Sequence, residues 1–527
     1  MASAAAFLTT PLHHLSPFLT TTSIAAITIS AGICYYLTAK RSNNNKQPPL
    51  PPEPRGAPVL GSIPMFLNRT PIHRKFTALS AEYGPIFKVR VGTKLYIVVS
   101  SPDLAKQVLR DNESVFSSRD VPLVVRACTY GGLDLACIPM GPDWASMRKA
   151  AVGKALSKAG LDGCYELRRR EVVKLLSELE VGKPVGVFEL AQEVIWNATL
   201  GMVWGGDVDY EETREVGNRM LRLLGKPNVS DVFPVLARFD LQGIEREGKE
   251  VARRFDRTVS AVIEKRLGGG GEKKEGDGVN NKTKDLFQVL LDSGAASSLA
   301  SMAHFKALLQ DIAVAGNENI SRMIEWAMSE LLNSDRAMKS VKRELDEMVG
   351  LDSLVEDHHL RDLKYIDAVI KETCRLHLAL VTRTANQTCT VGGFTVPQGT
   401  EVVVNGWAIH RDPQFWDEAS EFRPERFLDG GDGRSPAFDF MGGGSSGFRY
   451  IPFGSGRRGC AGVNLAERMM KYVLASFLHC FEWKLADGEG GVVDFADEFA
   501  LLIKKKRPLI AVPTPRLLAS ARPELLA

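Results

Sequence analysis

Residues 453–462 read FGSGRRGCAG, and this glycine-rich stretch around Cys460 decides how the rest of the chain is interpreted. Its backbone can turn tightly and approach a flat ligand closely at Gly454, Gly456, Gly459 and Gly462. An aromatic ring at Phe453 can pack on such a ligand, and Arg458 supplies a cation for a carboxylate. Cys460 precedes a helix expected over residues 463–474, where amide N–H groups and the helix dipole favour a thiolate.

A cysteine-ligated haem is the cofactor that these features suit together, because a thiolate ligand pushes electron density onto the iron. The alternative is a glycine-rich turn with a buried cysteine and a cationic surface. Gly, Arg and Cys indicate little when each is taken singly. The spacing F-x-x-G-x-R-x-C-x-G is far more restrictive, so we expect Cys460 to bind haem iron.

The loop resembles the haem-binding signature of the cytochrome P450 superfamily, and further segments agree in the same order along the chain. Residues 372–375 (ETCR) resemble the family's E-x-x-R helix, and residues 424–427 (PERF) resemble its P-E-R-F segment. Side chains at this i, i+3 spacing lie on one helix face, although exposed ion pairs of this kind are common. The resemblance implies a buried ion network of Glu372, Arg375 and Arg426 that braces the cysteine loop.

Residues 144–148 (WASMR) resemble the family's W-x-x-x-R helix, which binds a haem propionate. Buried carboxylates need charged hydrogen-bond partners, so several cations around the two propionates make physical sense. Without the cysteine loop, plain core packing would explain Trp144. The resemblance implies haem b (heme b, iron-protoporphyrin IX) bound by Trp144, Arg148, Arg383, Phe453, Arg458, Cys460 and Gly462.

The segment expected beside the oxygen-binding face of the haem departs from the family pattern. Residues 313–321 (AVAGNENIS) align with A-G-x-(D/E)-T-(T/S). Glu318 keeps the acid, but Asn319 stands where an alcohol is expected. Activation of O2 needs protons, and a hydroxyl can relay a proton whereas a neutral carboxamide cannot. We expect Glu318 and Asn319 to be the catalytic residues. Either a water chain or a polar group of the substrate replaces the alcohol, or the reaction does not require cleavage of the O–O bond.

The body of the chain is predicted to be mainly α with a small β part. Apolar periodicity predicts helices at residues 161–179, 251–267, 303–332 and 336–349. A short β-hairpin is expected at residues 86–90 and 95–99. Surface loops are expected at residues 268–285 and 429–447, which are rich in glycine and polar side chains. The resemblance implies a large single-core haem-thiolate fold over residues 59–516, followed by a tail at 517–527.

The N-terminus is predicted to be a membrane anchor. Residues 18–39 are uncharged and mostly apolar, and as a helix they would span roughly 30 Å. Lys40 and Arg41 place positive charge on the cytosolic side. A cleaved secretory signal would normally carry a basic start. A plastid transit peptide is the alternative, because residues 1–30 are rich in Ser, Thr and Ala and free of acids, but such peptides usually contain arginine and this stretch has none. We therefore expect a short segment at 1–17, an anchor at 18–39 in the endoplasmic reticulum membrane, and a basic, proline-rich hinge at 40–58 with a cytosolic catalytic domain.

Composition excludes other classes of protein. A net charge of +3 over 527 residues gives no reason to expect a nucleic-acid partner. The eight cysteines form no C-x-x-C pair and are too dispersed for a disulfide framework or zinc cluster. Apart from Cys460, they are interpreted as reduced core residues: Cys34, Cys128, Cys137, Cys164, Cys374, Cys389 and Cys480.

The leading functional hypothesis is a monooxygenase that inserts one oxygen atom from O2 into a lipophilic specialised metabolite, a terpenoid or a phenolic. The resemblance implies that electrons come from NADPH through a membrane-bound flavoprotein reductase. No G-x-G-x-x-G fingerprint follows a predicted strand, so the chain itself is not expected to bind NADPH. A largely apolar substrate pocket is expected from residues 121–140, 305–316, 378–382 and 499–501. Asn319 also favours an alternative, a haem-thiolate dehydratase or isomerase acting on an oxime or a peroxide. A haem-binding protein without enzymatic activity is a third possibility.

Overall fold

The computed structural model describes residues 48–67, 70–267, 284–378, 380–428, 438–442, 447–486, 492–499 and 503–517. The expected N-terminal segment and anchor (1–17 and 18–39), and most of the loops expected at 268–285 and 429–447, lie outside these residues. So does the expected tail apart from Leu517. Within the described ranges, no helix combines the length and the apolar character that crossing a bilayer requires.

Helices dominate the described chain, as expected. The helices of the first half are α3 (Ile72–Tyr83), α4 (Pro102–Lys106), α5 (Leu123–Cys128), α6 (Pro142–Ala150), α7 (Lys158–Gly163), α8 (Tyr165–Glu178), α9 (Val187–Trp204), α10 (Tyr210–Leu224), α11 (Val229–Val232) and α12 (Ile244–Leu267). Those of the second half are α13 (Leu286–Asp292), α14 (Ala295–Ser298), α15 (Met302–Val314), α16 (Asn317–Leu332), α17 (Asp335–Met348), α18 (Lys364–His377), α19 (Gly406–Ile409) and α20 (Val463–Cys480). Short 3-10 or π turns join them at η1 (Ile63–Phe66), η2 (Gln107–Asp111), η3 (Ala151–Ala155), η4 (Pro234–Phe239), η5 (His359–Arg361) and η6 (Pro424–Phe427).

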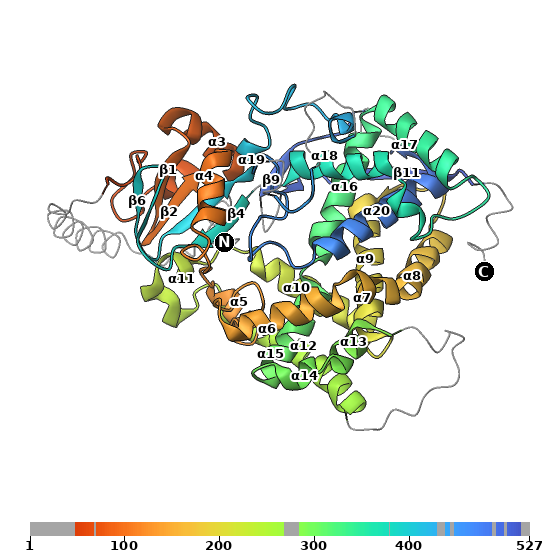
Figure 1. Cartoon of the computed structure of the whole chain (residues 1–527), viewed down its shortest axis with the longest axis horizontal. Coiled ribbons are helices and arrows are strands. Elements are labelled where there is room, and N and C mark those ends of the chain that lie inside the picture. The colour runs from red at the N-terminus through yellow and green to blue at the C-terminus, as the bar shows by residue number, and fades with distance from the viewer. Residues whose placement is uncertain are drawn as a thin grey trace.

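The strands in the described ranges form four small sheets. The largest has the order β1-β2-β7-β4, in which β2 and β7 are parallel and the other neighbours antiparallel. Its strands are β1 (Ile86–Val91), β2 (Lys94–Val99), β7 (Glu401–Asn405) and β4 (Leu380–Thr384). The others are β3 (Val185–Gly186), β11 (Ile510–Pro515) and β8 (Phe481–Leu485), the pair β9 (Asp497–Phe499) and β10 (Ile503–Lys505), and the pair β5 (Cys389–Val391) and β6 (Phe394–Val396). Strands β1, β2, β4 and β6 gather at one end with α3 and α4, and helices fill the other end (Figure 1).

The hairpin predicted near residues 86–99 is confirmed, because β1 and β2 pair in register from Ile86 with Val99 to Val91 with Lys94. The proline-rich part of the expected hinge is docked on the body rather than projecting as a free spacer. Lys88 N–H donates to the carbonyl of Pro52 at 2.8 Å, and Thr395 N–H donates to that of Pro49 at 2.9 Å. Proline fixes an extended backbone whose carbonyls remain free to accept such bonds.

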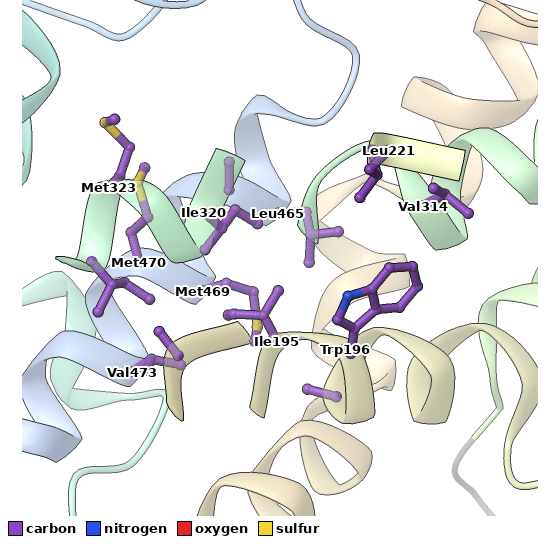
Figure 2. Close-up of a cluster of buried hydrophobic side chains, with 14 of the residues drawn as sticks. Ile195, Trp196, Leu221, Val314, Ile320, Met323, Leu465, Met469, Met470 and Val473 are labelled. Carbon is purple, nitrogen blue, oxygen red and sulfur yellow. The ribbon is translucent and has the colours of Figure 1, made fainter. Parts of the chain in front are cut away.

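The central core lies where α9, α16 and α20 meet. Apolar residues recur every three or four positions in the first turns of α20, so one face is buried there, and from Tyr472 to Cys480 the helix is buried on all sides. Figure 2 shows the side chains that interlock there: Ile195, Trp196, Ile320, Met323, Leu465, Met469, Met470 and Val473. Each fully buried apolar side chain of this size contributes roughly 1.5–3 kcal/mol. Because α20 follows Cys460 directly, this core holds the cysteine loop in place.

Two of the predicted helices are broken, which corrects the sequence-based expectation. The helix expected at 161–179 turns at Cys164, between α7 and α8, where the thiol donates to the carbonyl of Lys284. The helix expected at 303–332 is interrupted between α15 and α16. There the Asn317 side-chain amide donates to the carbonyls of Ala313 at 2.6 Å and Val314 at 3.3 Å. A side-chain donor of this kind competes with the backbone ladder and opens the helix locally.

The two remaining helix predictions hold with shifted boundaries. Helix α12 begins at Ile244, ahead of the expected start at 251, and ends at Leu267 as expected. Helix α17 covers Asp335–Met348, where Ser334 caps its N-terminus by accepting from Ala337 N–H.

Candidate functional site

The loop around Cys460 is a tight turn that leads into α20. Cys460 N–H donates to the carbonyl of Phe453 at 3.0 Å and closes the turn. Gly456 has φ +72°, and a Cβ there would lie 2.6 Å from the carbonyl oxygen of Leu109, so only glycine fits. Phe453 packs edge-on against Phe440, with ring centroids 5.6 Å apart.

The Cys460 thiol lies deep in the molecule yet keeps accessible surface. Burial raises the pKa of Cys460, and this effect outweighs the opposing hydrogen bond from Gly462 N–H and the charges of Arg119 and Arg148. Burial therefore opposes the thiolate that the amide groups at the start of α20 favour. A metal cation bound to the sulfur would reverse this balance.

Trp144 lies between two arginines. It is buried on α6, and the guanidinium carbons of Arg148 and Arg458 lie 5.6 Å and 5.1 Å from its ring centroid. The Trp144 Nε1–H group is buried and has no hydrogen-bond partner in the described part of the chain. Arg458 donates to the backbone carbonyls of Ser117, Leu135 and Ile138. The structure thus brings the tryptophan and both arginines to the cysteine loop.

Arg383 and Arg119 add two further cations to this cluster. Arg383 is 3% exposed and donates to the carbonyl of Arg458 at 3.3 Å. Burial lowers the pKa of Arg383 to about 9, and repulsion by Arg119 and Arg458 acts in the same direction. Burial likewise lowers the pKa of Arg458 to about 10, again with repulsion by Arg119. The cluster therefore concentrates positive charge in a site with little solvent.

Sequence reasoning missed Arg119. It follows Ser118, which is bridged to Thr384 beside β4, so Arg119 reaches the site only through a long-range contact. Its Nε–H is buried without a partner among the described residues. No local pattern around Arg119 distinguishes it from other arginines. Its place three residues after the apolar pair Val115 and Phe116 was the only available signal.

Glu372, Arg375 and Arg426 meet in one buried network. The Glu372 carboxylate accepts from Arg375 Nε at 2.7 Å and Nη2 at 2.8 Å, and from Arg426 Nε at 3.0 Å. Arg375 also donates to the carbonyls of His410 and Ala419, each at 2.7 Å. The network ties α18 to the segment that carries η6, which lies ahead of the cysteine loop. A buried carboxylate with this many donors is well compensated.

Glu318 and Asn319 lie in the first turn of α16, directly after the helix break. The Asn319 side-chain NH2 donates to the carbonyl of Ala315 at 2.9 Å. Glu318 approaches Arg322, with a distance of 3.6 Å between Oε1 and Nη2. Ala315 lines the main cavity of the molecule, whereas the side chains of Glu318 and Asn319 do not. The two are neighbours of the cavity and not part of its wall.

This cavity has a volume of about 380 Å³ and lies between the β4 strand, the loop before α6, and helices α10 and α15. All the expected wall segments contribute, through residues in 121–140, 305–316 and 378–382 and through Phe499. The wall is largely apolar, as expected, but it also carries polar side chains. Asp134, Gln310 and Asp311 line it, because the segment after α5 packs against α15 and turns polar side chains inward. The contribution of α10, with Met220 among others, was not foreseen.

Known proteins resemble this chain along most of its length. The chain matches the cytochrome P450 family across residues 51–512. It is 34% identical over 501 residues to 3,9-dihydroxypterocarpan 6A-monooxygenase of Glycine max, covering 92% of this chain and 96% of that protein. It is 32% identical over 494 residues to flavonoid 3'-monooxygenase of Petunia hybrida, covering 90% of this chain and 93% of that protein.

A solved structure shares the fold. Zebra fish cytochrome P450 with progesterone superposes with a TM-score of 0.69 at 23% identity, covering 85% of this chain and all of that one. At this identity the likeness concerns the fold alone. Taken with the family match and the plant relatives, it means that the chain belongs to the cytochrome P450 family and is a haem-thiolate oxidoreductase.

Proposed function

We propose that this protein is a monooxygenase that inserts one oxygen atom from O2 into a lipophilic phenolic or terpenoid metabolite. The observation that carries the proposal is the convergence of the Cys460 loop, four buried or half-buried arginines and a cavity of about 380 Å³. The named activities of the plant relatives, on a dihydroxypterocarpan and on flavonoids, support the phenolic class.

The residues fit a haem. Trp144 Nε1–H and Arg119 Nε–H are buried donors without partners in the described chain. Burial lowers the pKa of Arg383 and of Arg458, and repulsion by Arg119 adds to this effect, so two propionate carboxylates would relieve the repulsion within the cluster. Cys460 would be the axial ligand. Bound haem would supply the oxygen activation that amino-acid side chains cannot.

Each proposed haem contact has its own task. Trp144, Arg148, Arg383 and Arg458 would hold the propionates, with Arg119 as a further candidate. Phe453 would shield the sulfur, and Gly462 would donate its N–H to it, as its hydrogen bond with the Cys460 thiol suggests. Glu372, Arg375 and Arg426 would brace the loop from behind through their buried network.

Glu318 and Asn319 would belong to the proton path. The Asn319 NH2 is engaged with the carbonyl of Ala315, so this side chain offers its remaining oxygen as an acceptor. The Asn319 side-chain oxygen at this position can accept a hydrogen bond from a water molecule. The water, and not the side chain, would then relay protons, with Glu318 as their source on the solvent side.

The remaining parts of the proposal concern the surroundings of the enzyme. Residues 18–39 would anchor the chain in the endoplasmic reticulum membrane, after a short segment at 1–17. The hinge at 40–58 would connect the anchor to a cytosolic domain at 59–516, followed by a tail at 517–527. Electrons would come from NADPH through a flavoprotein reductase. The anchor is supported by the uncharged sequence that Lys40 and Arg41 follow.

Cofactor and co-substrate requirements test the proposal directly. The purified protein is reconstituted with a plant NADPH-dependent flavoprotein reductase and offered flavonoid and terpenoid substrates. We expect product only when NADPH and O2 are both present, with one atom of label from 18O2 in each product. Label from water, or equal turnover under anaerobic conditions, would contradict it.

A second function, a haem-thiolate dehydratase or isomerase, is favoured by one observation. Asn319 replaces the usual alcohol, and its NH2 is already bonded to Ala315. Such an enzyme would need neither reductase nor O2. Conversion of an oxime or a peroxide without NADPH in the same assay would select it over the monooxygenase.

A further inference from the structure

One end of the cavity is built from polar side chains that two segments bring together. Leu135 N–H donates to Asp311 Oδ2 at 2.7 Å, and the Gln310 Nε2–H donates to the carbonyl of Cys128 at 2.9 Å. These bonds tie the segment after α5 to α15. The Thr129 hydroxyl donates to Asp134 Oδ2 at 2.7 Å on the same side. The polar end is therefore a fixed part of the cavity wall.

The polar end has an excess of hydrogen-bond acceptors. Gln310 lines the cavity and is 2% exposed, and its Oε1 has no partner in the described chain. Its Nε2 is already used, so the unsatisfied atom is an acceptor alone. Asp311 and Asp134 line the same end and use one oxygen each for the bonds above. Buried acceptors without donors cost free energy, and a ligand that supplies a donor recovers it.

We propose that this polar end, formed by Gln310, Asp311 and Asp134, binds a hydroxyl group of the substrate and thereby fixes which carbon atom is oxidised. The inference rests on the proposed function and narrows it, because it requires a substrate with a phenol or alcohol group at one end. The apolar residues that α10 contributes, Met220, Leu221 and Leu224, would cover the hydrocarbon part of the same molecule.

A neutral hydroxyl suits the site better than an ammonium group. Burial raises the pKa of Asp311 well above its usual range, and repulsion by Asp134 adds to this effect. A carboxyl group that protonates easily has little attraction for a cation. A hydroxyl both donates and accepts, so it can serve Gln310 Oε1 and a protonated carboxyl together.

Matched ligands test the inference on the haem-loaded, full-length protein. The probes are 4'-hydroxyflavanone, 4'-methoxyflavanone and 4'-(aminomethyl)flavanone, with affinity measured by calorimetry, which needs neither reductase nor turnover. We expect the hydroxy compound to bind at least about ten-fold more tightly than the other two, because a site built around acceptors rejects a ligand that lacks the donor.

Substitutions at single residues test whether the polar end causes the difference in affinity between the hydroxy and methoxy compounds. Gln310→Met and Gln310→Leu each remove the unpartnered acceptor with little change in side-chain volume. Each should reduce the hydroxy-over-methoxy ratio to about three-fold or less. Gln288→Met, the same substitution on α13 at a residue that does not line the cavity, should leave the ratio as in the wild type.

Each outcome has one meaning. A wild-type ratio near one, tighter binding of the aminomethyl compound, or no binding of the hydroxy compound overturns the hydroxyl site. A ten-fold ratio that survives both Gln310→Met and Gln310→Leu also overturns it. If the ratio is as expected but labelled O2 never enters product, the hydroxyl site stands and the monooxygenase proposal fails.

Discussion

The guanidinium of Arg148 donates to the carbonyl oxygen of Gly459 at 3.0 Å, so helix α6 is bonded to the residue directly before Cys460. The two residues are 311 positions apart in sequence. This bond places one cation of the arginine cluster within reach of the sulfur, and the charge of Arg148 acts to lower the pKa of Cys460. The same side chain would thus serve both the loop and a haem propionate.

Arg148→Ala is expected to weaken haem binding by about ten-fold or more, since a charge-assisted bond contributes about 1.5–3 kcal/mol. The haem-to-protein ratio after purification, and the rate of haem transfer to apomyoglobin, measure the loss. Lys149→Ala is the matched control, because Lys149 is the next residue on α6 and is exposed. Equal haem retention in both variants would contradict a role for Arg148 in the site.

Glu372→Ala should destabilise the fold by about 3–5 kcal/mol, because it leaves Arg375 and Arg426 buried without their carboxylate. Urea denaturation followed by circular dichroism measures the change. Glu347→Ala on the exposed side of α17 controls for loss of a glutamate and should shift the transition little. A comparably small shift for Glu372→Ala would mean that the network does not brace the loop.

Asn319→Thr restores the alcohol of the family pattern next to the cavity. If Asn319 belongs to the proton path, the variant should divert electrons from released hydrogen peroxide to oxygenated product. The measurement is the ratio of oxygenated product to hydrogen peroxide for each NADPH consumed. We expect this ratio to change at least about two-fold, because the corresponding free-energy difference is smaller than that of a single hydrogen bond. An unchanged ratio would remove Asn319 from the proton path.

Glu401 makes stability depend on pH. Burial raises the pKa of Glu401 to about 7, and repulsion by Asp120 adds to this effect, although Lys94 opposes it. Between about pH 4.5 and 7 the folded state therefore binds more protons than the unfolded chain, so stability falls as the pH rises through this window. The full loss is at most about 3 kcal/mol.

The Glu401→Gln variant should lack this decline. We expect the thermal midpoint of the wild type to be lower at about pH 8 than at about pH 5. The variant should show a smaller decrease between the same two pH values. Glu347→Gln, at an exposed site, should behave as the wild type. A wild-type slope retained in Glu401→Gln would assign the pH dependence to other groups.

Short sequence motifs predicted those parts of the site that residues close together in the sequence form. The glycines around Cys460, the i, i+3 pair Glu372 and Arg375, and the pair Trp144 and Arg148 each carry their geometry in their spacing. The structure brings these groups together through contacts between distant segments.

The missed features depend on tertiary contacts or on competition within a helix. Apolar periodicity continues through Ala315 and Gly316, so nothing in it marks the break that the Asn317 amide produces by bonding to Ala313. Gln310 and Asp311 stand at ordinary helical positions, and only packing of the segment after α5 onto α15 makes them line a cavity.

The Cys460→Ala variant tests the central claim most directly, because everything proposed for the site depends on sulfur bound to iron. The measurement is the absorption spectrum of the reduced carbon monoxide complex, compared with that of the wild type and of Cys480→Ala, a buried cysteine at the far end of α20. The account predicts the red-shifted, thiolate-type Soret band in the wild type and in Cys480→Ala, and its loss in Cys460→Ala. A thiolate-type band that persists without Cys460 would contradict it.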